Sequence, residues 1–198
     1  MLPRTRNGLG PFECISAMQK CIRRGLEREA MEFACELTHS SKGLNTMCCN
    51  RLEIICHEDI NIITQPWILP FVATCCEQGR RWWKEDKPGR SRFPIGSAVR
   101  IMCRADKSRE GDHFGGAIGV PNLNGKKPEI PDFAKDMHTH MGKKMGRGFD
   151  HFVDEGCKLV PEPEPDPYME EWLEVVRANR ERKAKKVKVP ADQKDFPF

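Results

Sequence analysis

Residues 136–152 bring three of the six histidines together with carboxylates, side chains that could carry out chemistry. Carboxylate and imidazole groups of this kind bind divalent metals and support metal-assisted hydrolysis. In an extended segment His138 and His140 would share one side, whereas on a helix they would diverge by about 200°. A metal site in this segment would use the following side chains: Asp136, His138, His140 and His151. The preferred prediction is that the chain uses no cofactor, and a divalent metal bound by these side chains is the alternative.

The same segment also combines glycines with cations. They alternate along the chain as Gly142, Lys143, Lys144, Gly146, Arg147 and Gly148. Free backbone N–H groups and cationic side chains together suit the phosphates of nucleic acid or an acidic protein surface. The alternative is that the glycines only allow close packing against a helical core.

A second cluster, Cys56-His57-Glu58-Asp59, lies where a predicted helix ends. The helix dipole disfavours negative charge at that end, so these carboxylates need a partner. We expect Glu58 or Asp59 to pair with one of three cations, namely Arg51, Arg100 or Lys107. A catalytic carboxylate pair is the alternative, although only His57 could serve as a base nearby. The structural interpretation is preferred, and no catalytic residue is assigned.

Five helices must position these groups. Apolar residues at helical spacing predict them over 11–24, 27–37, 44–57, 66–83 and 94–105. Phe12, Ile15, Met18 and Ile22 form the predicted inward face of the first helix. Pro70 follows Pro66 by four residues, so the fourth helix must start late or kink. No convincing alternating pattern predicts a strand, and the fold class is a compact, all-α helical bundle.

Ten cysteines need an explanation in a chain without a secretion signal. Most fall on the apolar faces of the predicted helices, and none shows a Cys-x-x-Cys spacing. Adjacent pairs such as Cys48-Cys49 disfavour zinc, because neighbouring side chains on a helix point about 100° apart. Buried free thiols are the preferred interpretation, with a zinc site or disulfides as alternatives.

Several motifs recur in the order seen in one protein family. They are Ser16-Ala17-x-Gln19-Lys20-x-Ile22-Arg23-Arg24-Gly25, Glu29-Ala30, Arg51-Leu52 before Glu58-Asp59-Ile60, Ala98-Val99 and Ala105-x-Lys107-Ser108. Together they resemble the C-terminal domain of the RarA/MgsA replication-associated AAA+ ATPases, related to the Werner-helicase-interacting ATPase. The similarity covers roughly residues 11–116. It implies a clamp-loader-type collar domain that forms homo-oligomers, with Arg51, Glu58, Asp59 and Lys107 at a structural junction.

The departures from that family are informative. His57, Asn61 and Asp106 replace a small residue, a Gly and a Pro of the family pattern. No Walker A phosphate loop is present; near Gly142-Lys143, Lys144 stands where the hydroxyl residue should be. The resemblance therefore implies a collar domain without its ATPase. The tail also resembles an "Asp-x-His-Thr-x-x-Gly … Gly-Arg-Gly-x-x-His-Phe-x-x-Glu-Gly" pattern of family relatives.

Composition divides the chain into four segments. They are a helical domain over 1–120, an irregular Gly/His-rich basic extension over 121–160, an acidic Pro-rich linker over 161–167, and a C-terminal helix with a basic tail over 168–198. The linker is a semi-rigid spacer. The terminal helix carries a narrow apolar stripe, and its basic end is either a solvated tail or a phosphate-binding arm.

These observations favour a non-enzymatic, oligomerising scaffold in DNA replication, recombination or repair. It would bind single-stranded or forked DNA, or replication proteins, through cations: Arg80, Arg81, Lys143, Lys144, Arg147, Lys183, Lys185 and Lys186. One alternative is a metal-dependent hydrolase of nucleic acid or nucleotides centred on His138, His140 and His151. Another is a collar mimic that caps a host AAA+ ATPase, as a phage-encoded fragment could. The mild net charge of +4 decides none of these.

The expected cellular location is inferred from two missing kinds of apolar segment. No run of about 18 apolar residues could span a membrane, and the N-terminus lacks the apolar core of a signal peptide. A cytoplasmic protein without a membrane partner is expected.

Overall fold

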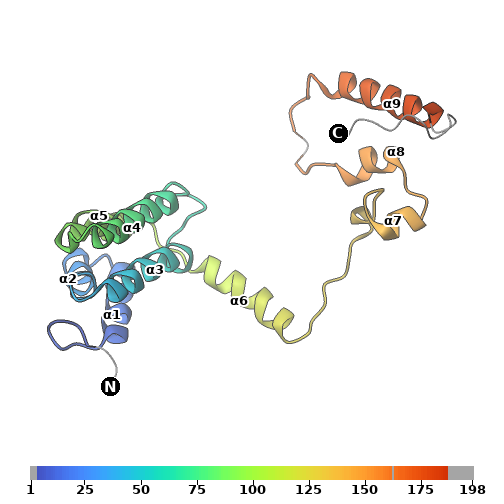
Figure 1. Ribbon diagram of the computed structural model, residues 1–198. Coiled ribbons are helices and arrows are strands. Elements are labelled where there is room, and N and C mark those ends of the chain that lie inside the picture. Colours follow the sequence, from blue (N-terminus) through green and yellow to red (C-terminus); the bar gives the residue numbers. More distant parts are fainter. Residues whose placement is uncertain (1–3, 162, 187–198) are drawn as a thin grey trace. The chain divides into compact units, whose positions relative to one another are not determined.

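The computed structural model describes residues 4–161 and 163–186, and within them the chain is helical. The elements are α1 Pro11–Arg23, α2 Glu27–Thr38, α3 Lys42–Asp59, α4 Ile68–Lys84, η1 Pro88–Ser91, α5 Arg92–Arg104, α6 Glu110–Leu123, η2 Asp132–Ala134, α7 His140–Lys144, α8 Phe149–His151, the π-helical η3 Phe152–Gly156 and α9 Met169–Lys186 (Figure 1). In the described ranges the one β feature is an isolated antiparallel bridge between Ile60 and Lys107. The all-α prediction is confirmed.

The chain divides into two compact units, residues 1–127 and 128–198. Unit 1 contains α1 to α6, and unit 2 contains α7 to α9 with η2 and η3. The predicted Gly/His-rich extension over 121–160 is thus divided: residues 121–127 belong to unit 1, and the rest shares unit 2 with the C-terminal helix. Among the helices described, none is both long and apolar enough to cross a bilayer.

Local chemistry explains where the first helices begin and end. Pro11 occupies the first position of α1, where its missing N–H costs nothing and its fixed φ suits the helix. Gly25 ends α1 with φ of 70°, and the N–H of Leu26 donates to the carbonyl of Cys21 at 3.0 Å. That left-handed glycine with its back-bonded neighbour is a Schellman ending. As predicted from Pro70, α4 starts late, at Ile68.

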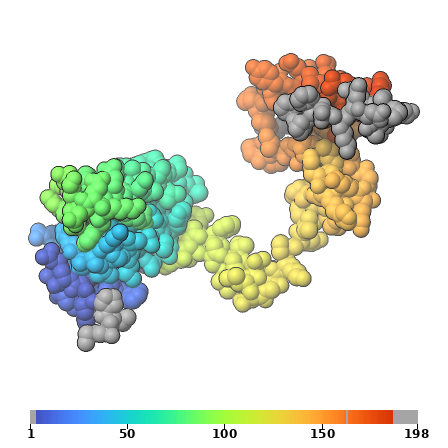
Figure 2. Space-filling model, in the orientation of Figure 1, coloured from blue at the N-terminus to red at the C-terminus, as the bar shows by residue number. Residues whose placement is uncertain are grey.

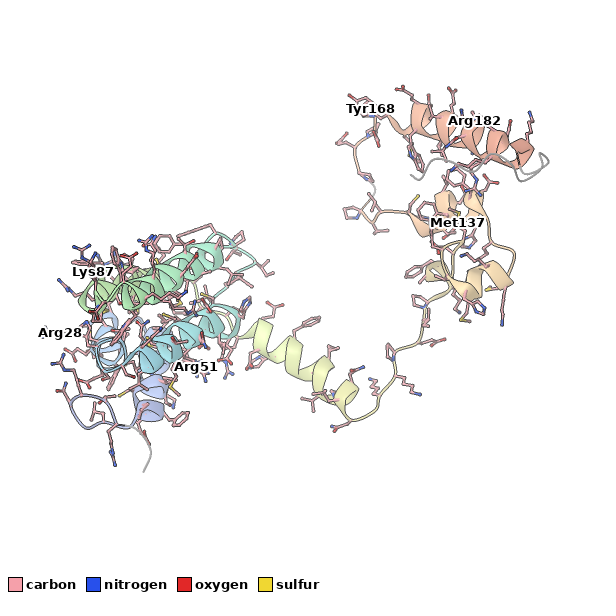
Figure 3. All side chains as sticks on the ribbon, viewed as in Figure 1. Arg28, Arg51, Lys87, Met137, Tyr168 and Arg182 are labelled. Carbon is pink, nitrogen blue, oxygen red and sulfur yellow. The ribbon has the colours of Figure 1, made fainter. Side chains whose placement is uncertain are left out.

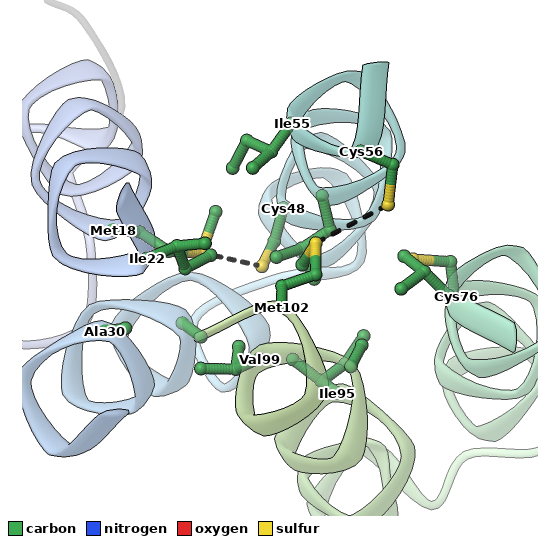
Figure 4. Close-up of a cluster of buried hydrophobic side chains, with 14 of the residues drawn as sticks. Met18, Ile22, Ala30, Cys48, Ile55, Cys56, Cys76, Ile95, Val99 and Met102 are labelled. Carbon is green, nitrogen blue, oxygen red and sulfur yellow. Dashed lines mark hydrogen bonds between the residues drawn. The ribbon is translucent and has the colours of Figure 1, made fainter. Parts of the chain in front are cut away.

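The core of unit 1 lies among α1 to α5 (Figure 4). Met18 and Ile22 of α1 lie in it with Ile55 of α3 and Met102 of α5, and each of these side chains is fully buried. The predicted inward face of α1 is confirmed except at Phe12, which is 62% exposed. Pro11 in the same turn is buried, and Phe12 lies about 100° further round the helix, at the edge of the packed face.

All ten cysteines are free thiols, as preferred above, and seven of them are buried. Two of these thiols donate to methionine sulfur across helix contacts, Cys48 to Met18 at 3.8 Å and Cys56 to Met102 at 3.5 Å (Figure 4). Burial raises the pKa of Cys56 to about 12, so this thiol stays protonated and packs as a small apolar group.

Helix α6 differs from the other helices of unit 1. It begins close to the end of α3: a Cβ at Gly111 would lie 2.8 Å from the carbonyl oxygen of His57, so only glycine fits at this position. None of its residues is buried, and it extends from the packed body formed by α1 to α5 (Figure 2). Its large apolar side chains are therefore left on the surface.

Two adjacent isoleucines of α3 provide a direct test of this core. Ile55→Ala should lower the free energy of unfolding by about 2–5 kcal/mol, because it leaves a cavity among α1, α3 and α5. Ile54→Ala removes the same atoms from a side chain that is 43% exposed, and it should change stability by about 0.5 kcal/mol or less. Urea denaturation measures both. Equal losses for the two variants would contradict this description of the core.

Candidate functional site

The carboxylate of Asp59 lies at the end of α3 and is fully buried. Its Oδ1 accepts from Nε of Arg23 at 2.7 Å, and its Oδ2 accepts from Nε2 of Gln19 at 2.8 Å. Arg109 approaches Oδ1 at 3.7 Å. The same Gln19 nitrogen donates to Glu58 at 2.6 Å. A buried carboxylate with these partners ties α1 to α3 and to the chain that enters α6.

The backbone closes the same junction. The N–H of Ser108 donates to the carbonyl of Asp59 at 3.1 Å, and the N–H of Asn61 donates to that of Asp106 at 2.9 Å. These bonds flank the bridge between Ile60 and Lys107. Three motifs far apart in the sequence, around residues 16–25, 58–60 and 105–108, therefore meet at one place.

The predicted partners of the carboxylates were wrong. Arg100 pairs with Glu27 at 3.4 Å, and Arg51 (labelled in Figure 3) has no described ion pair with Glu58 or Asp59. Lys107 instead donates from Nζ to the carbonyls of Cys103 and Ala105, at 2.9 and 2.6 Å. It thereby satisfies carbonyls at the end of α5, and burial lowers its pKa.

Unit 2 is organised around Asp136. Its Oδ2 lies 3.0 Å from Nδ1 of His138, and its Oδ1 accepts the N–H of the same residue at 3.0 Å. The bond from His138 lowers the pKa of the Asp136 carboxyl. Phe152 packs edge-on against the imidazole, with ring centroids 4.8 Å apart. Gly142 lies so close to the carbonyl of Asp136 that a Cβ there would overlap it.

The predicted metal ligands are only partly brought together. His138 lies in a turn and His140 begins α7, so the extended segment that would align them does not form. Within the described residues, no three His, Cys, Asp or Glu side chains gather as a metal site. Asp136 and His138 meet, whereas His140 is exposed and Nδ1 of His151 is buried without a described partner. A divalent metal cofactor stays a prediction.

The predicted cations fall into two groups. Arg80 and Arg147 are held by the protein: Arg80 contacts Glu53 at 3.0 Å, and Arg147 donates to the carbonyls of Asp132 and Lys135 at 2.7 and 3.1 Å. The remainder have exposed side chains wherever these are described: Arg81, Lys143, Lys144, Lys183 and Lys185. Lys186 ends α9, but its side chain lies outside the described residues, as do residues 187–198.

An additional group lies at the end of α4. The indole of Trp82 is covered by two guanidinium groups, those of Arg81 at 4.9 Å and Arg90 at 5.0 Å from the ring centroid. Arg92 lies over Phe93 at 4.3 Å in the same region. We call residues 80–93 the basic-aromatic turn; Lys87, labelled in Figure 3, lies within it.

Charge is concentrated in this turn. Residues 80–92 contain six Lys and Arg side chains against Glu85 and Asp86, a net charge of +4. The whole chain has the same net charge, +4, so the remaining residues balance one another. Sequence reasoning found Arg80 and Arg81 but missed Trp82 and Arg90. Arginines spaced around two tryptophans and a Lys-Pro-Gly turn were the signal that could have revealed them.

A comparison with protein-family models found no match, and neither did a comparison with curated proteins.

Removing the Asp59 carboxylate tests the junction. Asp59→Ala should lower the free energy of unfolding by about 3 kcal/mol, the lower end of the range for a broken buried pair, because Arg23 keeps some contact with water. Asp106→Ala removes an exposed carboxylate from the same junction and should change stability by about 0.5 kcal/mol or less. Chemical denaturation measures both. Similar, small losses would contradict the central role of Asp59.

Proposed function

We propose that this chain is a non-enzymatic, oligomerising accessory module that binds nucleic acid, acting in DNA replication or recombination. The stacked side chains of Trp82, Arg81 and Arg90 in the basic-aromatic turn support the nucleic-acid part most directly. The resemblance to the RarA/MgsA C-terminal domain supports the replication context. The convergence of its three motifs at Asp59 is consistent with that resemblance.

The arginines around Trp82 are held in a way that suits phosphate binding. A guanidinium that lies over an indole can still bond phosphate oxygens through N–H donors in its own plane. Arg81 shares its Nε with an exposed ion pair to Glu85 at 3.6 Å. Because Trp82 already orders both guanidiniums, less side-chain entropy is lost when they bind. Phosphate contacts of this kind give affinity without strong sequence preference. Binding to single-stranded DNA should therefore be tight at low salt and weak at high salt.

Helix α6 supports the oligomerising part. Phe114 and Ile118 lie four residues apart on one face of α6 and are 70% and 62% exposed. Apolar side chains grouped on an exposed helix face mark interaction surfaces. A second copy of this chain is the proposed partner, with the same face of α6 buried in both copies, as expected for a two-fold interface.

DNA binding by the intact chain tests the first part. Trp82→Ala should weaken binding to a single-stranded oligonucleotide about 5- to 30-fold, because ordering the two guanidiniums on binding would then cost about 0.5–1 kcal/mol each. Arg81→Ala with Arg90→Ala should also reduce the dependence of log affinity on log salt by about 1.4. Fluorescence anisotropy across a salt series measures both.

The controls are matched in chemistry. Trp67→Ala removes an exposed tryptophan at the other end of α4, and Arg24→Ala with Arg28→Ala removes one cation that follows α1 and one from α2. Both should bind as the unmodified chain does. DNA binding that is absent, or equally weakened by the control variants, would overturn this part of the proposal.

Light scattering tests self-association. The chain should have a mass above 22.7 kDa, and Phe114→Ser with Ile118→Ser should reduce the mass to that of the monomer. Phe12→Ser, which alters an exposed aromatic on α1, should leave the mass unchanged. A monomer at every concentration measured would refute oligomerisation while leaving the DNA result intact.

A further inference from the structure

The basic-aromatic turn forms part of the wall of a small pocket. The pocket has a volume of about 230 Å³ and is lined by Arg6, His39, Pro88, Gly89 and Arg92. These residues come from three separate parts of unit 1: the N-terminal turn, the end of α2, and the η1–α5 connection. Three of the five lining residues are basic. The pocket is smaller than the 300–1,000 Å³ typical of small-molecule sites, so it suits a compact group.

Hydrogen bonds fix the backbone around the pocket. The N–H of Arg6 donates to the hydroxyl of Ser40 at 2.8 Å, next to His39. Ser91, which is fully buried, donates from its hydroxyl to the carbonyl of Gly79 at 3.0 Å and so holds the turn that contains Gly89. The indole of Trp83 donates to the carbonyl of Thr38 at 3.0 Å. The basic side chains therefore extend from anchored positions.

The charged side chains around His39 are two arginines and one glutamate, a net positive charge that favours an anion. Burial lowers the pKa of His39, the positive charges of Arg6 and Arg92 lower it further, and Glu36 on α2 opposes this effect. The Glu36 carboxylate also accepts from Asn7. Two guanidiniums thus lie near one carboxylate and an imidazole whose neutral form is favoured, and Nε2 of this imidazole is enclosed without a hydrogen-bond partner among the described residues. An entering anion would favour protonation of His39.

We propose that Arg6, His39 and Arg92 form a binding pocket for a phosphate monoester, the terminal phosphate of a nucleic-acid strand. This inference rests on the proposed nucleic-acid binding and specifies which part of the strand this pocket takes. A terminal phosphate carries a charge of about −1.5 to −2 near neutral pH, against −1 for an internal phosphate, and offers three acceptor oxygens. Two arginines and a histidine match that charge and those acceptors better than they match a diester.

Continuity with the basic-aromatic turn supports this assignment. Pro88 and Gly89 line the pocket, and the next residue, Arg90, stacks on Trp82. The N–H of Lys87 donates to the carbonyl of Trp82 at 2.8 Å, which joins the two features through one short turn. A strand end in the pocket would place its following phosphates along the cations of the turn.

Inorganic phosphate tests the pocket without nucleic acid. Titrating phosphate at constant ionic strength should shift the His39 imidazole resonances to saturation and raise the pKa of His39. Arg6→Gln and Arg92→Gln should each weaken phosphate binding about tenfold or more, as expected for lost charge-assisted bonds. Arg28→Gln, an exposed arginine on α2, is the charge-matched control. Shifts that do not saturate, or that are unchanged by Arg92→Gln, would overturn the pocket.

Oligonucleotides distinguish the strand end from free phosphate. A single strand with a terminal phosphate should bind more tightly than the same strand with terminal hydroxyls, and Arg6→Gln with Arg92→Gln should abolish the difference. Trp82→Ala should weaken both strands by the same factor. Equal affinity of both strands, with binding that still depends on Trp82, would refute the strand-end assignment and leave the proposed function standing. Phosphate binding by a chain that binds no DNA would refute both the strand-end assignment and the proposed function.

The pH dependence gives an independent check on His39. Because the pKa of His39 is lowered in the folded chain, the unfolded state binds the proton more readily. Stability without phosphate should therefore fall as pH falls through the range near 6.5. Phosphate should reduce that fall, and His39→Gln should remove the phosphate effect on it. A pH profile of thermal unfolding that phosphate leaves unchanged would count against His39 as part of the pocket.

Discussion

The buried carboxylate of Asp59 is the interaction on which the rest of unit 1 depends. A buried charge is costly unless it is paired and hydrogen-bonded, so Asp59 fixes the positions of Gln19 and Arg23 on α1. The following backbone bonds hold residues 105–108 against the end of α3. Together these contacts set where α5 ends and where α6 begins. The exposed face of α6 is thus a consequence of a polar junction rather than of apolar packing.

The core and the surface use cations in opposite ways. Near the core, Arg23, Arg80 and Lys107 are held by carboxylates or carbonyls and contribute to the arrangement of the helices. At the basic-aromatic turn, Arg81 and Arg90 lie over an indole, which orders a guanidinium without neutralising it, and Arg81 also has an exposed ion pair with Glu85 at 3.6 Å. Because residues 80–92 alone have a net charge of +4, a chain with a modest net charge can still present a concentrated basic surface.

Helical periodicity predicted the all-α class and the positions of the first five helices, because apolar spacing and Pro or Gly at helix ends act over a few residues. Pro70 correctly delayed α4, and free thiols were correctly inferred from cysteines on apolar stripes. Phe12 was placed wrongly: Pro11 in the same turn is buried, whereas Phe12 lies about 100° round the helix from it, at the edge of the packed face. Periodicity reports a helix face, not how wide a part of that face the neighbouring helices cover.

The sequence by itself determined helix type, core composition and the candidates for a charged junction. Only the tertiary structure decided that Asp59 pairs with Arg23 and Gln19, since those residues lie 36 and 40 positions away and nothing local selects them over Arg51 or Arg100. It likewise brought Arg6, His39 and Arg92 to one pocket. Partners across helices depend on how the helices cross, a property of the packed whole that no short stretch of sequence encodes.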